Sequence, residues 1–385
     1  MSIPWFLHMV ELQDIFAQHG ETYRLKHGLS LDQLKAMRSI QNCRTAALGG
    51  HVDECEECGF KRISYNSCRN RHCPKCQTLN KERWIEARKD DLLNVGYFHV
   101  VFTLPDIINA VTYQNQKAVY TILFKAAAET LSELAADKKY LGAQIGVTAV
   151  LHTWGQNLMH HPHLHCIVPG GGLNSFGKWV KSRKKFFIPV KVLSRKFRGK
   201  FLYYLKQAKL EYHGSISDLN DPCRFHNWKS SLYQKEWVVY CKPPFKNAGC
   251  VVEYLGRYTH RVAISNNRIV KLKDGGVTFK WRDYKDRNKL KEMNLTSDEF
   301  IRRFLTHVLP TGFTRIRHYG LLSPRNKATK LKLCKKLTRT PIIDSPKPKL
   351  TSLELLKKLT GKDFNLCPCC RVGHFSRASP LPAIA

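Results

Sequence analysis

One short run, His160-His161-Pro162-His163-Leu164-His165-Cys166-Ile167-Val168-Pro169, limits strongly what the surrounding chain can fold into. Residues 162–168 predict a strand, and the side chains of a strand point alternately to its two faces. His163 and His165 therefore share one face, while Leu164 points to the opposite face and into a core. Because two imidazoles held in this way can bind one divalent metal ion, the run predicts a sheet with a metal site on one face.

A third ligand is expected from the preceding strand, which is predicted over residues 144–154. If this strand pairs with the histidine strand, His152 lies on the same face as the histidine pair. Three imidazoles would leave metal positions open for phosphate oxygens and water, as a Lewis-acid catalyst requires. Gln156 is the rival third ligand, His160 and His161 are weaker candidates, and an ordinary surface role for these histidines stays open.

A pair of tyrosines follows in the run Glu253-Tyr254-Leu255-Gly256-Arg257-Tyr258-Thr259-His260-Arg261, part of a helix predicted over residues 247–258. Tyr254 and Tyr258 are four residues apart and so share one helix face. A tyrosine hydroxyl can attack a phosphodiester and form a covalent phosphotyrosine. Core or interface tyrosines are commoner in general, but the histidine strand in the same chain favours catalysis. The phosphate charge can be offset by neighbouring basic side chains, namely Arg257, His260 and Arg261.

Cysteines and histidines gather in residues 43–76 at spacings typical of zinc ligands. The two Cys-x-x-Cys turns are Cys55 with Cys58 and Cys73 with Cys76, and together they can complete a tetrahedral zinc site. A second, interleaved site is predicted from the remaining candidates, which are Cys43, His51, Cys68 and His72. The pairing of these eight ligands stays open, as does the interpretation that some are ordinary buried residues.

This spacing favours zinc in a reducing cytoplasm over disulfide bonds, and basic residues around the turns suggest a zinc-stabilised DNA-binding element. A further Cys-x-x-Cys, Cys367 with Cys370, has no second pair unless Cys334 or His374 contributes, so whether it binds a metal is left open. The chain starts without the features of a secretory signal and contains no long apolar stretch, so neither secretion nor a membrane span is expected.

The charge of the chain points to a polyanionic partner. It has 64 Lys and Arg against 30 Asp and Glu, a formal net charge of +34. Nucleic acid is the commonest partner of so basic a chain. Residues 181–200 contain nine basic residues and no acid, and Phe186, Phe187 and Phe197 lie among or beside them as candidates to stack on bases. The residues predicted to contact DNA are Lys184, Lys185, Arg195, Arg198, Arg257 and Arg261.

The remaining patterns predict an α+β fold with irregularly alternating helices and strands. The predicted helices cover residues 77–95, 111–136, 190–210 and 297–309, with short helices in 7–36. Further predicted strands cover residues 97–103 and 237–241, and a hairpin joins 268–272 to 277–281. We divide the chain into a helical segment (1–36), a zinc-binding domain (37–80), a catalytic domain (81–322) and a basic, flexible tail (323–385).

The cysteine block, the His-Pro-His-Leu-His strand and the tyrosine helix occur in this order, and together they resemble the two-tyrosine transposases of the insertion sequence 91 family. These belong to the HUH endonuclease superfamily, in which two histidines flank a hydrophobic residue. The resemblance covers about residues 7–325, and the Tyr-Leu-Gly-Arg-Tyr run and the glycines after the histidine strand add to it.

The resemblance implies a five-stranded antiparallel sheet with helices, preceded by a zinc-binding module. It also implies a Mg²⁺ or Mn²⁺ ion bound by His163 and His165, and nucleophilic roles for Tyr254 and Tyr258. Single-stranded DNA from the element ends and the target would be cut in rolling-circle-like transposition, leaving a 5′-phosphotyrosine and a free 3′-OH. Two alternatives remain, a plasmid replication initiator or relaxase with the same chemistry, and a non-catalytic zinc-dependent DNA-binding regulator in which the tyrosines are dispensable.

Overall fold

The computed structural model describes residues 9–182, 188–245, 251, 254, 256, 262–342 and 350–384. Its described α-helices are α1 (Leu12–Lys26), α2 (Leu31–Gln41), α3 (Pro74–Lys89), α4 (Asn109–Gln114), α5 (Gln116–Ala136), α6 (Val190–Gln207), α7 (Pro222–Gln234), α9 (Ser297–Leu305), α10 (Lys332–Leu337) and α11 (Ser352–Thr360). Its described strands are β1 (Gly50–Cys55), β2 (Lys61–Tyr65), β3 (Tyr97–Thr103), β4 (Gly146–Trp154), β5 (His160–Pro169), β6 (Gly171–Leu173), β7 (Trp179–Lys181), β8 (Val239–Phe245), β9 (Ile269–Lys273), β10 (Gly276–Asp283), β11 (Lys289–Thr296), β12 (Ile316–Gly320) and β13 (Phe375–Leu381).

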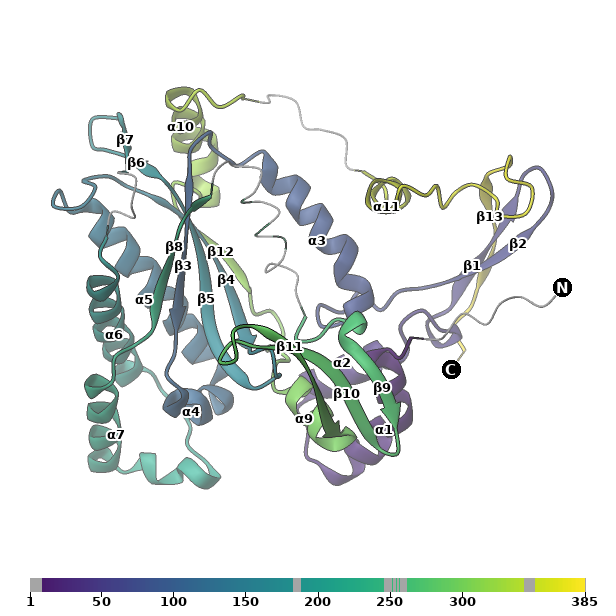
Figure 1. The fold of residues 1–385 in the computed structure, drawn as a ribbon, viewed down its shortest axis with the longest axis horizontal. Coiled ribbons are helices and arrows are strands. Elements are labelled where there is room, and N and C mark those ends of the chain that lie inside the picture. Colours follow the sequence, from purple (N-terminus) through teal and green to yellow (C-terminus); the bar gives the residue numbers. More distant parts are fainter. Residues whose placement is uncertain are drawn as a thin grey trace.

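A five-stranded sheet with the order β12-β4-β5-β3-β8 forms the centre of the molecule (Figure 1). All four strand pairings are antiparallel, so the α+β fold and the five-stranded antiparallel sheet expected from the sequence are confirmed. The predicted strand 97–103 is β3, and the long helix predicted over 111–136 is interrupted at Asn115. The third strand of the hairpin sheet, β11, was not expected from the sequence.

One face of this sheet is covered by α5 and α6, which run beside it in Figure 1. Alternate residues of the central strands, such as Phe102, Leu151 and Leu164, pack there against helix residues such as Phe124 and Phe201, and all five are fully buried. Because alternate residues of a strand point to opposite faces, this apolar layer directs the histidines of β5 to the other face. Helix α3 lies on that other side, where its Trp84 joins a small apolar cluster with sheet residues.

The N-terminal helices pack against a sheet from much later in the chain. Phe16 of α1 contacts Phe304 of α9 with ring centroids 5.5 Å apart, and Phe279 of β10 contacts Phe300 at 5.8 Å. These aromatic residues share one core with α2, in which Met37 is fully buried. Residues 12–41 and the β9-β10-β11 sheet therefore form one packed unit rather than separate segments.

The C-terminal segment carries ordered structure, so the prediction of a flexible tail from about residue 322 is wrong for its described part. Helices α10 and α11 lie in it, and β13 pairs with β1 in a second sheet of order β13-β1-β2. The sequence interpretation failed because the partner of β13 is more than 300 residues away in the chain. The predicted boundary at residue 80 falls inside α3, which the two predicted domains therefore share. Among the described residues, no helix is long and apolar enough to cross a membrane.

Candidate functional site

Three histidines meet on the face of the central sheet that α5 and α6 leave open. His152 of β4 lies directly opposite His163 of β5, and Val150 lies opposite His165. The pairing of the two strands on which the prediction depended is therefore present. One ring nitrogen from each of His152, His163 and His165 lies within 4.8 Å of the other two. Three neutral imidazoles at this spacing can bind one divalent ion and leave its remaining positions open.

A hydrogen bond orients the imidazole of His163. The Nδ1 atom of His163 lies 2.6 Å from the carbonyl oxygen of His161, and a carbonyl oxygen can only accept. Nδ1 of His163 therefore carries the proton, and Nε2 is left with a lone pair for a metal. Burial lowers the pKa of His163 to about 4, so its imidazole is neutral at neutral pH, as metal binding requires.

His99 of β3 connects the histidine group to a tyrosine, and the sequence interpretation missed it. Its Nε2 lies 2.8 Å from Nδ1 of His165, and its Nδ1 lies 3.1 Å from the hydroxyl oxygen of Tyr254. The rings of His99 and His165 are stacked, with centroids 5.0 Å apart. The only sequence signal was a histidine within an apolar strand, and nothing local indicated that β3 would lie beside β5.

The tautomers along this chain of contacts depend on one another. If Nε2 of His165 binds a metal, its Nδ1 carries the proton and donates to Nε2 of His99. A neutral His99 then carries its own proton on Nδ1 and donates it to the hydroxyl oxygen of Tyr254. Burial lowers the pKa of His99 to about 3, with smaller contributions from Lys242 and His163, so this ring is neutral at neutral pH.

The described residues around Tyr254, which are Val251, Tyr254 and Gly256, have helical backbone between the central sheet and α3. Val251 is fully buried in a cluster with Tyr97 and Ile167 of the sheet. A Cβ atom added at Gly256 would lie only 2.2 Å from Cδ1 of Ile85 in α3, so the backbone approaches α3 closely there. The rest of the predicted helix, including Tyr258, Arg257, His260 and Arg261, lies outside the described residues.

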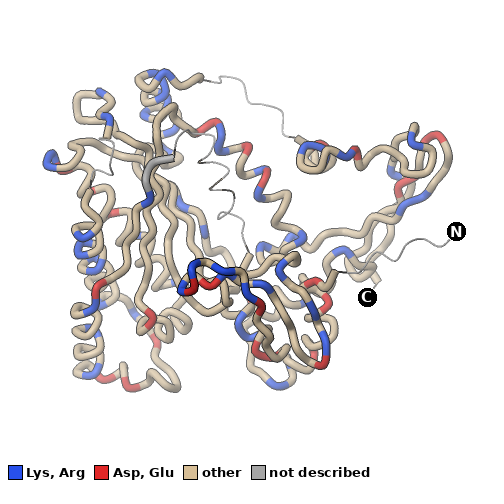
Figure 2. Tube along the Cα trace, in the orientation of Figure 1, with Lys and Arg blue, Asp and Glu red and all other residues tan. Residues whose placement is uncertain are grey.

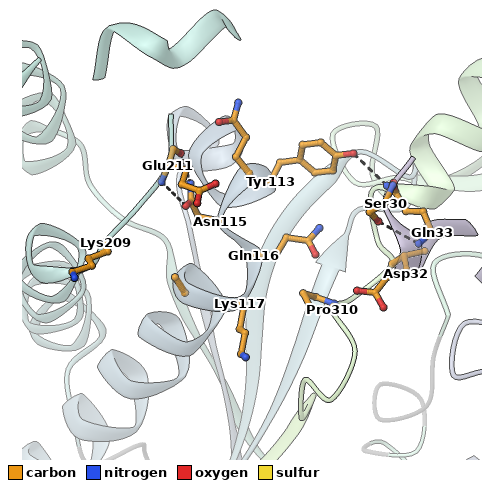
Figure 3. A pocket seen from close by; sticks show the side chains of 13 residues that line it. Ser30, Asp32, Gln33, Tyr113, Asn115, Gln116, Lys117, Lys209, Glu211 and Pro310 are labelled. Carbon is orange, nitrogen blue, oxygen red and sulfur yellow. Dashed lines mark hydrogen bonds between the residues drawn. The ribbon is translucent and has the colours of Figure 1, made fainter. Parts of the chain in front are cut away.

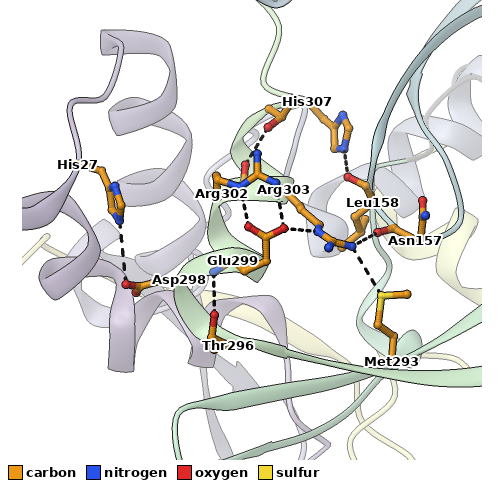
Figure 4. A network of polar contacts seen from close by, with 11 residues as sticks. His27, Asn157, Leu158, Met293, Thr296, Asp298, Glu299, Arg302, Arg303 and His307 are labelled. Carbon is orange, nitrogen blue, oxygen red and sulfur yellow. Dashed lines mark hydrogen bonds and ion pairs between the residues drawn. The ribbon is translucent and has the colours of Figure 1, made fainter. Parts of the chain in front are cut away.

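The turn between β4 and β5 is held by α9 and the residues that follow it (Figure 4). The Nη1 of Arg303 donates to the carbonyl oxygen of Asn157 at 3.0 Å, and Nε2 of His307 donates to that of Leu158 at 2.9 Å. Glu299 accepts from the guanidinium of Arg303 at 2.6 Å and so orients it. These contacts fix the turn that joins the two strands carrying His152 and the histidine pair.

The rival ligands are not part of the group of three, although the ring of His161 lies beside that of His163 with centroids 5.2 Å apart. The amide of Gln156 donates to the hydroxyl of Tyr284 at 3.2 Å. His160 contacts the hydroxyl of Tyr120 at 3.0 Å through Nε2, and His161 lies 3.9 Å from a carboxylate oxygen of Asp106. Of the candidates weighed from the sequence, His152 is the one that the structure brings to the histidine pair.

The first cysteine group contains Cys43, Cys68, Cys73 and Cys76. The sulfur atoms of Cys43 and Cys76 are 3.6 Å apart, as are those of Cys68 and Cys76, and those of Cys73 and Cys43 are 3.7 Å apart. Four sulfurs at about 2.3 Å from a tetrahedral zinc would be separated by about 3.8 Å, whereas a disulfide would need about 2.0 Å. The group therefore fits a Zn²⁺ ion, and Pro74 starts α3 directly after one ligand.

The second cysteine group differs from the combination that the sequence suggested first, with the pairing left open. Cys55 and Cys58 meet Cys367 and Cys370 from the C-terminal segment, not Cys73 and Cys76. The sequence interpretation treated nearby pairs as partners, but the β1–β13 pairing brings the distant pair closer.

The two histidines proposed as zinc ligands are not brought to either cysteine group. Nε2 of His51 lies 3.2 Å from a carboxylate oxygen of Asp53, and Nε2 of His72 accepts from the amide of Leu309 at 3.3 Å. The structure thus places four cysteines in each group and leaves both histidines with other contacts.

Lys and Arg recur along α6, around α10 and along the β9–β11 sheet (Figure 2). On α6, Arg195 is exposed, and Arg198 donates to the carbonyl oxygen of Lys235 at 2.8 Å. Phe197 is fully buried in the core, so the prediction that it stacks on bases is wrong. Lys200 lies 3.1 Å from a carboxylate oxygen of Glu129 in α5, which shows that part of this basic run neutralises a neighbouring helix. Lys184, Lys185, Phe186 and Phe187 lie outside the described residues.

A pocket between α2 and the start of α5 lies apart from all of these groups (Figure 3). Its lining includes Asp32, Tyr113 and Glu211, and none of the residues predicted to act in catalysis, metal binding or DNA binding lines it. The candidate site on the sheet is therefore separate from this pocket.

Two family models match the chain. One, described as "Transposase zinc-binding domain", matches residues 15–104, and the other, described as "Putative transposase", matches residues 146–330. The first match contains the first cysteine group, and the second contains the three histidines and Tyr254. Cys367 and Cys370 lie outside both matches.

Similar proteins include "Putative transposase y4qJ" of Sinorhizobium fredii, which is 50% identical over 371 residues, covering 94% of this chain and 93% of that protein. The transposase for insertion sequence element IS801 of Pseudomonas savastanoi pv. phaseolicola is 27% identical over 304 residues, covering 77% of this chain and 72% of that protein. Two solved complexes of the relaxase TrwC with DNA are each 12% identical to this chain, with a TM-score of 0.25. The first match covers 44% of this chain and 68% of the solved chain, and the second covers 62% and 72%, respectively. A TM-score of 0.25 is too low to support an argument about fold or function.

Proposed function

This chain belongs to the insertion sequence 91 family of transposases, and we propose that it cuts and rejoins single-stranded DNA at the element ends through a covalent tyrosine–phosphate bond. The observation that carries the proposal is the continuous set of contacts from the histidine group through His99 to the hydroxyl of Tyr254. These contacts support a tyrosine nucleophile beside a group of histidine metal ligands, as metal-assisted phosphodiester cleavage requires.

His152, His163 and His165 would hold a Mg²⁺ or Mn²⁺ ion, which, when bound, would polarise a phosphate oxygen as a Lewis acid. Imidazole nitrogen is a poorer ligand for Mg²⁺ than for transition metals, so of the two ions Mn²⁺ fits this donor set better. All three ligands are neutral, so the ion would keep its full charge for the phosphate. The ligand set thus supports a polyanionic substrate.

Tyr254 would act as the nucleophile. Its hydroxyl oxygen forms a bond to phosphorus while the bond from phosphorus to the 3′ oxygen breaks, which leaves a 5′-phosphotyrosine and a free 3′-OH. Water takes the hydroxyl proton from the half-buried tyrosine and supplies a proton to the leaving oxygen. His99 orients the attacking oxygen by donating Nδ1–H to it, and that contact stabilises the negative charge on the oxygen as the proton leaves.

Tyr258 would serve as a second nucleophile, because residues four apart on a helix share one face. Rejoining is the reverse attack, in which a 3′-OH displaces the tyrosine from phosphorus. Arg257 and Arg261 would offset phosphate charge, and Lys184, Lys185, Arg195 and Arg198 would contact the strand along its backbone. The reduced cysteines that zinc requires favour the cytoplasm, in contact with chromosomal DNA, as the place of action.

The test incubates the protein with Mn²⁺ or Mg²⁺ and 5′-labelled or 3′-labelled single-stranded oligonucleotides from the element ends. We expect an adduct that survives denaturing electrophoresis and carries only the label on the 3′ side of the cut. The Tyr254→Phe/Tyr258→Phe double variant should form no adduct, whereas Tyr203→Phe, a change to an exposed tyrosine of α6, should behave as the wild type does. An adduct that persists in the double variant, or is absent with all end sequences, would contradict the proposal and favour a non-catalytic DNA-binding role.

A further inference from the structure

Two Cys-x-x-Cys turns from opposite ends of the chain face each other in the second cysteine group. The sulfur of Cys58 lies 3.7 Å from that of Cys367, and the sulfur of Cys55 lies 3.7 Å from that of Cys370. The two pairs are separated by 309 and 315 residues in sequence. As in the first group, these separations match the edges of a tetrahedron of sulfurs around zinc and are too long for disulfides.

The backbone around the C-terminal turn is arranged to stabilise thiolates. The amide of Cys369 donates to the sulfur of Cys367 at 3.4 Å, and the amide of Gly373 donates to the sulfur of Cys370 at 3.3 Å. Such amide–thiolate contacts are typical of the outer shell of cysteine metal sites.

The two turns are packed together closely. A Cβ atom at Gly373 would lie 2.5 Å from the sulfur of Cys55, so only glycine leaves room for the four sulfurs. The amide of Glu56 donates to the carbonyl oxygen of His374 at 3.0 Å, and next to it β13 pairs with β1. The guanidinium of Arg62 lies 4.0 Å from the ring centroid of Phe375 and so adds a cation–π contact across the joint.

We propose that Cys55, Cys58, Cys367 and Cys370 bind a second, structural Zn²⁺ that fastens the C-terminal segment to the N-terminal zinc-binding region. Tetrahedral coordination by four thiolates selects zinc among the common divalent ions. The site is closed, because all four positions are taken by cysteine, so its role is structural, and the proposal does not rest on the DNA chemistry proposed above. We call it the clasp site.

The clasp site is also connected, through α11, to α3, the helix that packs against the segment carrying Tyr254. Helix α11 leads toward the C-terminal turn and lies against α3, where Arg83 donates to the hydroxyl of Ser352 at 2.6 Å and Lys358 lies 2.9 Å from a carboxylate oxygen of Glu86. Ile85, which lies between Arg83 and Glu86 in α3, contacts the backbone at Gly256. Zinc at the clasp site would therefore hold α11 in place against the helix that supports the tyrosine segment.

The first test counts zinc in purified full-length variants by elemental analysis. Cys55→Ser/Cys58→Ser and Cys367→Ser/Cys370→Ser should each contain one zinc per chain fewer than the wild type. The variant with all four changes should also lose only one, because both pairs share a single ion. Cys369→Ser is the matched control, since it makes the same change in the same turn at an exposed cysteine outside the group, and it should retain all zinc.

The second test needs no variant and so does not depend on the variants folding. Cys58 and Cys369 are both exposed, but only Cys58 belongs to the group. In the folded wild-type protein, iodoacetamide should modify Cys369 quickly and Cys58 only after zinc is removed with a strong chelator, as read by peptide mass spectrometry. Equal labelling of the two cysteines before chelation would overturn the proposal, as would unchanged zinc in Cys367→Ser/Cys370→Ser.

Discussion

Gly256 lies where the segment that carries Tyr254 touches α3, and we predict that Gly256→Ala slows DNA cleavage while leaving the protein folded. The added Cβ would lie 2.2 Å from Cδ1 and 2.9 Å from Cγ1 of Ile85. Carbon atoms in contact prefer about 3.5 Å or more, so the overlaps are about 1.3 and 0.6 Å. Rotation of the Ile85 side chain about its second torsion can move Cδ1, but the β-branched first torsion holds Cγ1 in place.

The remaining overlap of about 0.6 Å has to be relieved by movement of the tyrosine segment. That segment has little room on its other side, because Val251 is fully buried against Tyr97 and Ile167 of the sheet. A misplacement of about 1 Å can cost about 100-fold in rate, so we expect the adduct to form about 10- to 100-fold more slowly. Overpacking of about 1–3 kcal/mol is partly offset by the helix preference of alanine, about 1 kcal/mol, so folding should survive.

The assay measures single-turnover adduct formation, with thermal unfolding followed in parallel. Shortening Ile85 should restore the rate in steps, because Ile85→Val removes only Cδ1, whereas Ile85→Ala removes both overlapping atoms. We therefore expect the rates to rise from Gly256→Ala alone, through its combination with Ile85→Val, to its combination with Ile85→Ala. Gly199→Ala is the control, since Gly199 is also helical but has open space where a Cβ would lie. A wild-type rate for Gly256→Ala, or no rescue by either change at Ile85, would refute this reasoning.

Three further predictions follow from the same contacts. His99→Ala should slow adduct formation about 100-fold through loss of the hydrogen bond to Tyr254, with unchanged zinc content; an undiminished rate would remove His99 from the mechanism. At the three-histidine group, Mn²⁺ should support faster cleavage than Mg²⁺ at equal concentration, and His152→Ala should abolish that difference. Burial lowers the pKa of His307 to about 4 from 6.5, so the folded state keeps it neutral while the unfolded chain takes up a proton below pH 6.5. Stability should therefore fall by up to about 3 kcal/mol as the pH drops from 6.5 toward 4, and His307→Gln should lose less over that range in urea titrations.

Local patterns were sufficient to predict much of the catalytic face. The alternation of strand side chains placed His163 and His165 on one face, and the assumed pairing of adjacent strands placed His152 beside them. Adjacent strands joined by a short connection usually pair, so this step needed no long-range information. The same local reasoning predicted β3 and the paired strands β9 and β10.

The residues that sequence reasoning missed depend on contacts between distant parts of the chain. His99 faces His165 only because β3 inserts beside β5, a pairing across 66 residues that the local pattern of neither strand specifies. Cys367 meets Cys58 across 309 residues, which is why the sequence suggested only the nearer pair, Cys73 and Cys76, as partners of Cys55 and Cys58 and left the pairing open. Backbone geometry makes side-chain alternation a local property, whereas strand order and register are set by the burial of whole faces. The sequence alone thus determined which chemistry the chain carries, and tertiary packing decided which histidine reaches the tyrosine and which cysteines come together.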